Sequence, residues 1–357
     1  MAVKPIQPTA STSATAQNSL SFPAQTFAKL SPAPFLLAHL DPDSASKPSI
    51  RPNGRAPSEF RPPTAHTGSL THASGSAVVR VGDTAVVCGV RGEILLASDV
   101  PGYRVGNTSG TGGTSQSGDA EIAEIGLLVP NLELATGCSP AHLPGNPPST
   151  LAQSLNERIL SLLHASQLVE ADGLRIWHQP PSANAAEDGD ESDEPAEPEV
   201  KAFWCLYIDI LFISLDGNPF DAAWAAVIAA LRDAWLPHAW WDIDREMILC
   251  DDAISKARRL ELRGMPFAST FAVFEPRQQG GGKRKEKRAW ILADPDTFEE
   301  GLCREGISIV VDCANGHTAK LVKIEKSGGG VIGLKEMREV VEMAGDRWKE
   351  WRKIVAG

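Results

Sequence analysis

The sequence predicts an α+β fold built from two similar halves, because strand-forming segments precede a helix twice along the chain. In the first half, a β-hairpin at 76–90 and a buried strand at 203–215 precede an apolar helix. In the second half, we expect strands at 246–250, 267–275, 289–294, 307–312 and 320–326. A C-terminal helix follows them, and its apolar stripe consists of Leu334, Met337, Val341, Trp348 and Trp351.

The segment from 203 to 237 organises the first half as a strand, a turn and a helix. Only Asp209 and Ser214 interrupt the apolar strand, which predicts burial on both faces and favours a satisfied core carboxylate for Asp209. Asn218 is placed to cap the helix, and Pro219 suits its first turn. Apolar residues recur at helical spacing up to the end that we expect at Pro237: Phe220, Trp224, Val227, Ile228, Leu231 and Trp235.

Local signals predict the remaining elements of the first half. Residues 27–40 could form a helix or two turns, and the glycine-rich stretch 101–118 lacks the lysine and following helix of a phosphate-binding loop. We expect strands at 121–129 and 174–177. Between them, Ser149 or Thr150 caps a helix with Arg158 off its apolar stripe, which consists of Leu151, Leu155, Ile159, Leu162 and Leu163.

The formal net charge of −11 is concentrated in two polar segments. Residues 187–199 contain eight acidic residues and no basic one, whereas KRKEKR at 283–288 contributes +4. Without them the net charge is −11 + 8 − 4 = −7, so charge gives no sign of a wide nucleic-acid-binding face. We interpret both segments as solvated loops, and the acidic one has the alternative of an interaction tail.

Targeting, metal and cofactor signals are weak in this sequence. The first 20 residues have the composition of a disordered segment and lack the apolar core of a signal peptide, and no stretch is as apolar as a membrane span. The six cysteines have no paired spacing, so we expect reduced core thiols, and the histidines show no metal-binding pattern. We therefore expect a soluble intracellular protein without metal or cofactor.

Several ordered motifs resemble the RNase PH family, and within it the non-catalytic ring subunits of the eukaryotic RNA exosome. They are RPNGR at 51, GSLTHASGSAVVRVGDTAVVCGV at 68–90, LDGNPFDAAWAAVIAAL at 215–231 and EKSGGGV at 325–331. The resemblance covers about 51–345 and implies an RNase PH-like domain of two βαβ-type halves, of the ribosomal protein S5 domain 2-like class. We expect a first half at 51–240 with an acidic loop at 180–200, and a second half at 241–357 with a basic loop at 277–288. Residues 1–50 form an N-terminal extension.

The resemblance also allows the catalytic residues of active relatives to be compared with this chain. Active relatives cleave RNA by phosphorolysis, with a carboxylate pair and arginines that neutralise the developing charge. Here the strand slot for an aspartate reads Gly306, Ile307 and Ser308, and Arg91 is the only basic residue of the turn after VVCGV. We therefore expect a catalytically silent chain. We interpret the nearby carboxylates as an acidic helix start, and these are Asp294, Asp296, Glu299 and Glu300.

RNA contact is possible at a few basic side chains, which are Arg91, Arg158, Lys283 and Arg284. Arg158 fits a salt bridge within its helix equally well, and the last two lie in a segment without aromatic residues for base stacking. The resemblance implies a heterodimer with another RNase PH-like subunit in a six-membered ring, S1/KH-type cap subunits, a processive or hydrolytic catalytic subunit, and single-stranded RNA. It implies 3′ to 5′ RNA decay and rRNA processing in the nucleus, nucleolus and cytoplasm. The alternatives are an active phosphate-dependent exoribonuclease and a stand-alone RNA-binding module.

Overall fold

The computed structural model describes residues 23–42, 47–103, 115–140, 142–143, 145–180, 198–276, 289–314 and 319–356. Strands and helices are mixed along the whole chain, and this confirms the predicted α+β class. Among the described residues, no helix combines the length and the apolar character that crossing a membrane requires.

The first half contains a six-stranded sheet with the order β1, β2, β3, β6, β4, in which β5 also pairs with β6. Its strands are β1 (Pro63–Thr67), β2 (Gly75–Val81), β3 (Thr84–Leu96), β4 (Leu128–Leu134), β5 (Arg175–His178) and β6 (Glu199–Ser214). All pairs are antiparallel except β4 with β6. The predicted hairpin is confirmed as β2 and β3, which turn at Gly82 and Asp83.

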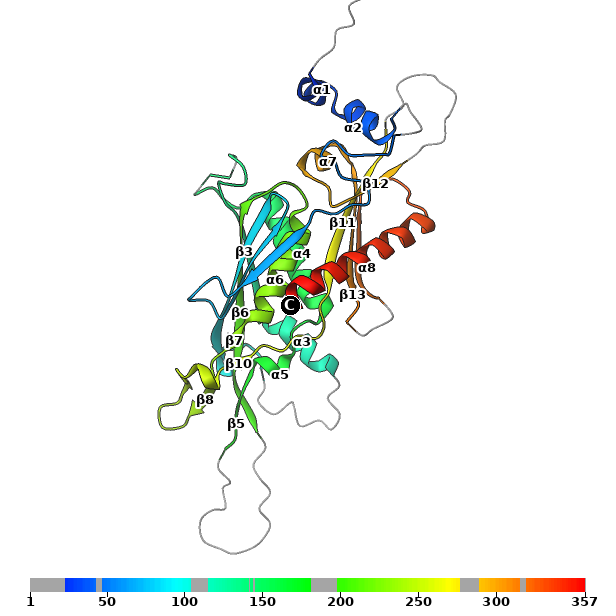
Figure 1. The fold of residues 1–357 in the computed structure, drawn as a ribbon. Helices are drawn as coiled ribbons and strands as arrows, with labels where there is room; N and C mark the ends of the chain where they lie inside the picture. Colours follow the sequence, from blue (N-terminus) through cyan, green and yellow to red (C-terminus); the bar gives the residue numbers. More distant parts are fainter. Residues whose placement is uncertain are drawn as a thin grey trace, which may run out of the picture.

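The second half contains a four-stranded antiparallel sheet with the order β12, β11, β13, β14. Its strands are β11 (Phe267–Phe274), β12 (Trp290–Ala293), β13 (Glu305–Asp312) and β14 (Lys320–Ser327), close to their predicted ranges. Helix α7 (Thr297–Leu302) connects β12 to β13, and the C-terminal helix α8 (Leu334–Ala356) packs across β11 and β13 (Figure 1).

Helices α4 (Thr150–Ser166) and α6 (Pro219–Asp233) lie between the two sheets (Figure 1). Every residue of α6 from Phe220 to Leu231 is buried, as its alanine-rich sequence predicts. The helix approaches β2 so closely that a Cβ atom on Gly75 would lie 2.5 Å from the carbonyl oxygen of Ala230. A side chain at that position would therefore force the helix and the sheet apart.

Four smaller helices and four short strands complete the described chain. Helices α1 (Ala24–Leu30) and α2 (Pro32–Leu40) occupy one end of the molecule, where α2 buries Leu36 and Leu40 in a small cluster with Phe274, Trp290 and Leu292 (Figure 1). The other helices are α3 (Ser115–Ile125) and α5 (Ala171–Leu174), with 3₁₀ turns η1 (Ala97–Asp99) and η2 (Ile254–Lys256). The strands form two ribbons: β7 (Trp235–Leu236) with β10 (Arg258–Arg259), and β8 (Ala239–Asp242) with β9 (Met247–Cys250).

The structure corrects several expectations about the elements of the first half. Helix α3 begins at Ser115, so a helix does follow the glycine-rich stretch, and residues 121–125 belong to this helix rather than to a strand. Ile122 and Ile125 of α3 pack against the core. Helix α6 ends at Asp233, four residues before Pro237, so Trp235 lies in β7 and is 49% exposed. Ser149 caps α4 as predicted, but Leu151 is exposed. Asn218 occupies the cap position of α6, yet its side chain accepts no bond from a helix N–H group.

Strand β6 is covered on one face only along its second half, so the prediction of burial on both faces is wrong there. Its burial alternates from Ile208 onward, with Leu211 38% exposed and Ile213 50% exposed. Val78 of β2 and Val87 of β3 lie beside Leu211 on the same face and are half-buried. We call Val78, Val87, Leu211 and Ile213 the open sheet face. One apolar core contains residues of both halves and therefore does not mark where one half ends. The boundary that we expect between the halves at residue 240 stays a prediction.

Candidate functional site

Arg158 lines a cavity of about 590 Å³ where α4 meets the second sheet. Its guanidinium forms an ion pair of 2.7 Å with Glu325 of β14 and donates a 3.1 Å hydrogen bond to the hydroxyl of Ser308 in β13. It also stacks over the ring of Phe220, 3.9 Å from the ring centre. The alternative of a salt bridge within the helix is therefore wrong, because the partner comes from the other half of the chain.

A chain of hydrogen bonds leads from Arg158 into the core. The Ser308 hydroxyl lies 3.0 Å from that of Thr270, which donates a 2.7 Å bond to the carboxylate of Asp221 in α6. Asp221 is buried, which raises its pKa, although bonds from Asn218 and Thr270 oppose this effect. With the hydroxyls oriented in this way, Ser308 accepts from Arg158 and donates to Thr270, so every member of the chain has a partner.

Asn218 connects this chain to a second set of charged residues. Its amide nitrogen donates 2.7 Å bonds to both Asp221 and Asp294, which explains why the side chain turns away from the helix N–H groups. Asp294 is 1% exposed and forms an ion pair of 2.7 Å with Arg61. Burial alone would raise the pKa of Asp294, but the hydrogen bonds and charge of Arg61 outweigh it and lower the pKa to about 2.

The RPNGR segment brings two further arginines to the same region. Arg51 is fully buried and bonds to Glu299 at 3.1 Å and to the carbonyl oxygen of Ala293 at 2.9 Å. Arg55 lies 3.6 Å from Asp294 and donates to its carbonyl oxygen. These arginines tie the segment before β1 to the second sheet, so the motif has a structural role in this chain.

The acidic helix start is confirmed for Asp296, Glu299 and Glu300: the first two form a capping box at the N-terminus of α7, and Glu300 lies in its first turn. It is wrong for Asp294, whose side chain pairs with Arg61 as described above. Glu300 accepts a 2.8 Å bond from the backbone N–H of Asn218 and lines the Arg158 cavity. Of the four carboxylates, it is the one that faces this cavity.

The slot for a strand-borne aspartate also faces the cavity. Gly306 and Ser308 of β13 line it, whereas Ile307 is fully buried on the other face of the strand. The slot thus presents a hydroxyl that is already bonded to Arg158 and Thr270. This arrangement contains no carboxylate at the slot that could bind a metal or transfer a proton.

The other residues singled out from the sequence do not join this cavity. Arg91 lies on β3, where its exposed guanidinium forms an ion pair of 3.2 Å with Glu93. Lys283 and Arg284 lie outside the described residues, as does the acidic segment up to residue 197. Asp209 is exposed and accepts a 3.1 Å bond from Asn131, so the interpretation as a core carboxylate is wrong. The face of β6 that carries Asp209 is uncovered in the described part of the chain, so the carboxylate lies in solvent.

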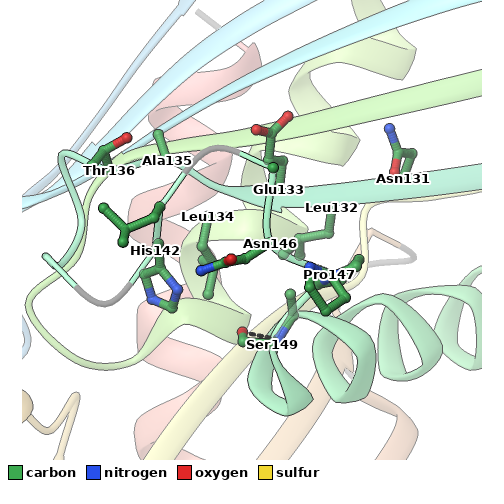
Figure 2. Close-up of a pocket in the computed structure, with 14 residues that line it drawn as sticks. Asn131, Leu132, Glu133, Leu134, Ala135, Thr136, His142, Asn146, Pro147 and Ser149 are labelled. Atoms are coloured by element: carbon green, nitrogen blue, oxygen red, sulfur yellow. Dashed lines mark hydrogen bonds between the residues drawn. The ribbon is translucent and has the colours of Figure 1, made fainter.

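A second cavity of about 630 Å³ lies between β4 and the loop before α4 (Figure 2). Leu132 and Leu134 point into it from the face of β4 opposite to Asn131 and Glu133, as Figure 2 shows. His142 and Asn146 come from the loop, and no lysine or arginine lines the cavity among the described residues. It is therefore poorly suited to a phosphate group, and no motif in the sequence pointed to it.

All six cysteines are unpaired, as expected. Cys88 and Cys205 are buried, whereas Cys250 is exposed, so the expectation of core thiols holds for only part of the set. Burial raises the pKa of the Cys303 thiol to about 12, and nearby carboxylates add to the effect. A thiol with this pKa is a poor nucleophile.

Comparison with known proteins identifies the relatives of this fold. Residues 59–237 match domain 1 of the 3′ exoribonuclease family, RNase PH. The exosome complex component Rrp43 of Schizosaccharomyces pombe is 30% identical over 325 residues, which cover 91% of this chain and 95% of that protein. The exosome complex component Rrp42 of Methanothermobacter thermautotrophicus is 25% identical over 82% of this chain and 85% of its own length. The motifs of this sequence likewise resemble ribosomal-RNA-processing protein 43 more than other ring subunits.

Solved structures share the fold at lower sequence identity. The Archaeoglobus fulgidus exosome with RNA bound to the active site gives a TM-score of 0.58 at 22% identity, with 90% of this chain and 96% of that chain covered. The archaeal exosome core gives a TM-score of 0.52 at 21% identity, with 85% and 91% covered. Together with the match over 59–237 and the similarity to Rrp43, the fold shows that the chain belongs to the RNase PH family of 3′ exoribonucleases.

Proposed function

We propose that the chain is a non-catalytic structural subunit of the RNA exosome ring, and that it supports 3′ to 5′ decay and rRNA processing by guiding RNA to a catalytic subunit. Similarity to Rrp43 along nearly the whole chain supports the place in the complex. The residues that line the Arg158 cavity give the main support for the loss of catalysis. There the strand slot offers Ser308 in place of a carboxylate, and Arg158 is neutralised by Glu325.

The open sheet face supports the presence of neighbouring subunits. A sheet face that is apolar at its centre gains free energy when a partner covers it. Leu211 and Ile213 are its most exposed side chains, and Asp209 and Glu133 give it a polar rim. This mixture of an apolar centre and a polar rim is typical of subunit interfaces. Its proposed occupant is another RNase PH-like subunit, and S1/KH-type subunits would cap the resulting ring.

Gentle purification of the tagged chain from its own cells tests the place in the complex. We expect one assembly that contains several different RNase PH-like proteins together with cap subunits and a catalytic subunit. A free monomer, or a ring of this chain alone, would contradict the proposal. Imaging of the tagged chain tests the proposed distribution over nucleus, nucleolus and cytoplasm.

An RNA-shortening assay in phosphate tests the loss of catalysis. We expect no phosphate-dependent shortening of single-stranded RNA by the purified chain or by its dimer with a catalytically inactivated partner. Phosphate-dependent shortening that disappears in the Asp296→Asn variant would show an active exoribonuclease and overturn this part of the proposal.

A further inference from the structure

Tryptophans gather at the end of the molecule opposite to α1 and α2, where β5, β7, β8 and β10 meet (Figure 1). They are Trp177 in β5, Trp204 in β6, Trp235 in β7, and Trp240 and Trp241 in β8. Trp177 is 40% exposed, and Trp240 stacks on His238 with the ring centres 5.9 Å apart. Large indoles held partly in solvent are typical of binding surfaces, because each offers contact area at low entropic cost.

A cavity of about 220 Å³ opens among these elements. Trp177, Trp204 and Leu236 form its apolar walls, and Arg175, Arg258 and Arg259 also line it. We call it the arginine–tryptophan pocket. Its volume lies below the range of about 300–1,000 Å³ that drug-sized ligands occupy, so it has room for one ring system.

The apolar walls of the pocket are held in place by close packing. Trp204 is 6% exposed and Leu236 is 4% exposed. A Cβ atom on Gly92 would lie 2.8 Å from the side chain of Leu236 and 3.1 Å from that of Trp204. The two side chains therefore pack directly onto the backbone of β3, which fixes the position of this wall of the pocket.

The three arginines of the pocket differ in their bonding. Arg175 forms ion pairs with Glu121 and Asp172 and lies 5.8 Å from the ring centre of Trp177, so it orients that indole. Arg259 donates a 2.8 Å bond to the carbonyl oxygen of Arg232. Arg258 is exposed, and its side chain has neither a hydrogen bond nor an ion pair within the part of the chain that the structure describes. The pocket thus combines an aromatic slot with one guanidinium that is free to bind an anion.

We propose that the arginine–tryptophan pocket binds one base of single-stranded RNA, which stacks on Trp177, while Arg258 pairs with the adjoining phosphate. A flat uncharged ring linked to an anion matches both parts of the pocket. A cationic ligand is disfavoured by the three arginines, since Glu261 is the one acidic residue among the described residues that line the pocket. The choice of RNA over an acidic aromatic peptide rests on the proposed function. This pocket and the Arg158 cavity are lined by different elements.

Binding of a fluorescent oligouridylate to the full-length chain tests the inference. Trp177→Ala should weaken binding about fivefold or more, because base stacking on an aromatic side chain contributes at least about 1 kcal/mol. Arg258→Ala should weaken binding and reduce the slope of log K against log salt by about 0.7, the contribution of one phosphate on a single strand. Trp177→Phe and Arg258→Lys should retain part of the affinity, which separates binding from a folding defect.

Arg245→Ala is the matched control, because Arg245 is exposed on the neighbouring β8–β9 turn and pairs with Asp242 outside the pocket. RNA affinity that is unchanged in the Trp177 and Arg258 variants, or that falls equally in the control, would overturn the inference. Binding of an acidic aromatic peptide with no binding of RNA would also overturn it. Each variant is also purified from its cells to test whether it joins the complex. Normal assembly of the variants with unchanged RNA binding would reject the RNA-binding role of this pocket and leave the proposed function intact. If the wild-type chain itself does not assemble, the proposed function is rejected.

Discussion

Asp294 joins the two halves of the chain through its carboxylate. It follows β12 in the second sheet, and its carboxylate accepts bonds from the side chain and backbone N–H of Arg61 and from Asn218 of the first half. It adopts a left-handed backbone conformation, with φ of 50°, which is uncommon for a residue with a side chain. The surrounding bonds hold it there, so the residue is tightly constrained.

We expect Asp294→Asn to destabilise the chain by about 3–5 kcal/mol, because the buried Arg61 loses its closest counter-charge and keeps the more distant, partly exposed Asp216 at 3.8 Å. Urea unfolding at pH 7 measures this effect. Asp296→Asn is the matched control: asparagine caps a helix about as well as aspartate, so its stability should change by less than about 0.5 kcal/mol. Equal stability of the two variants would contradict the role assigned to Asp294.

The same carboxylate should make folding sensitive to acid. Its folded pKa of about 2 lies below the ordinary value of 3.8, so its ionised form stabilises the fold above pH 3.8. That contribution is lost as the pH falls from about 4 toward 2. Urea midpoints across this window should fall more steeply for the wild type than for Asp294→Asn. Parallel curves would show that Asp294 keeps an ordinary pKa.

Ser308 is the hydroxyl through which Arg158 reaches the core network. Ser308→Ala should cost about 1 kcal/mol, since Arg158 and Thr270 each lose one hydrogen bond while Arg158 keeps Glu325. Thermal unfolding measures the loss. A change of more than about 3 kcal/mol would show that the network depends on Ser308 more than its bonds indicate.

Helix α6 illustrates how packing of a whole element depends on one backbone position. Its small residues allow β2 to approach until Gly75 touches Ala230 and Ala234. Gly75→Ala should therefore cost about 1–3 kcal/mol or more through overpacking. Gly301→Ala in α7 provides the control, because the added Cβ meets no atom within 4 Å beyond its chain neighbours and the backbone of its own helix, and alanine is the better helix former. It should leave stability unchanged or raise it by up to about 1 kcal/mol.

Among the described residues, nothing covers the open sheet face, and the proposed assembly accounts for it. Leu211→Asp should prevent incorporation of the tagged chain into the complex, because a buried, unpaired carboxylate at an interface is costly. The isolated chain should keep its stability, since Leu211 is already 38% exposed. Ile254→Asp, at a side chain that is 87% exposed in η2, should assemble normally. Normal assembly of Leu211→Asp would show that this face is not the interface.

Local patterns in the sequence were sufficient for elements whose signals are short-range. The hairpin of β2 and β3 follows from two β-rich runs around Gly82 and Asp83, and α4 follows from its serine cap and apolar spacing. Strand β9 lies within the range expected at 246–250, whereas its partner β8 and the helical state of 121–125 were missed. The helix at 121–125 places Ile122 in a core made by residues far away in the sequence, and local patterns carry little information about such packing. The motifs that resemble the RNase PH family predicted the family of this chain. The match to the family and the similarity to a known exosome component confirm that prediction.

The sequence alone therefore determined the class of fold, the family and the absence of an aspartate at the strand slot, since these depend on residue identity and order. Only the tertiary structure decided the roles of the charged side chains. Asp209 is exposed, Asp294 is buried against Arg61, and Arg158 pairs across the two halves with Glu325. The partners of these side chains lie 78 to 233 residues away along the chain, and periodicity carries no information about such distant contacts.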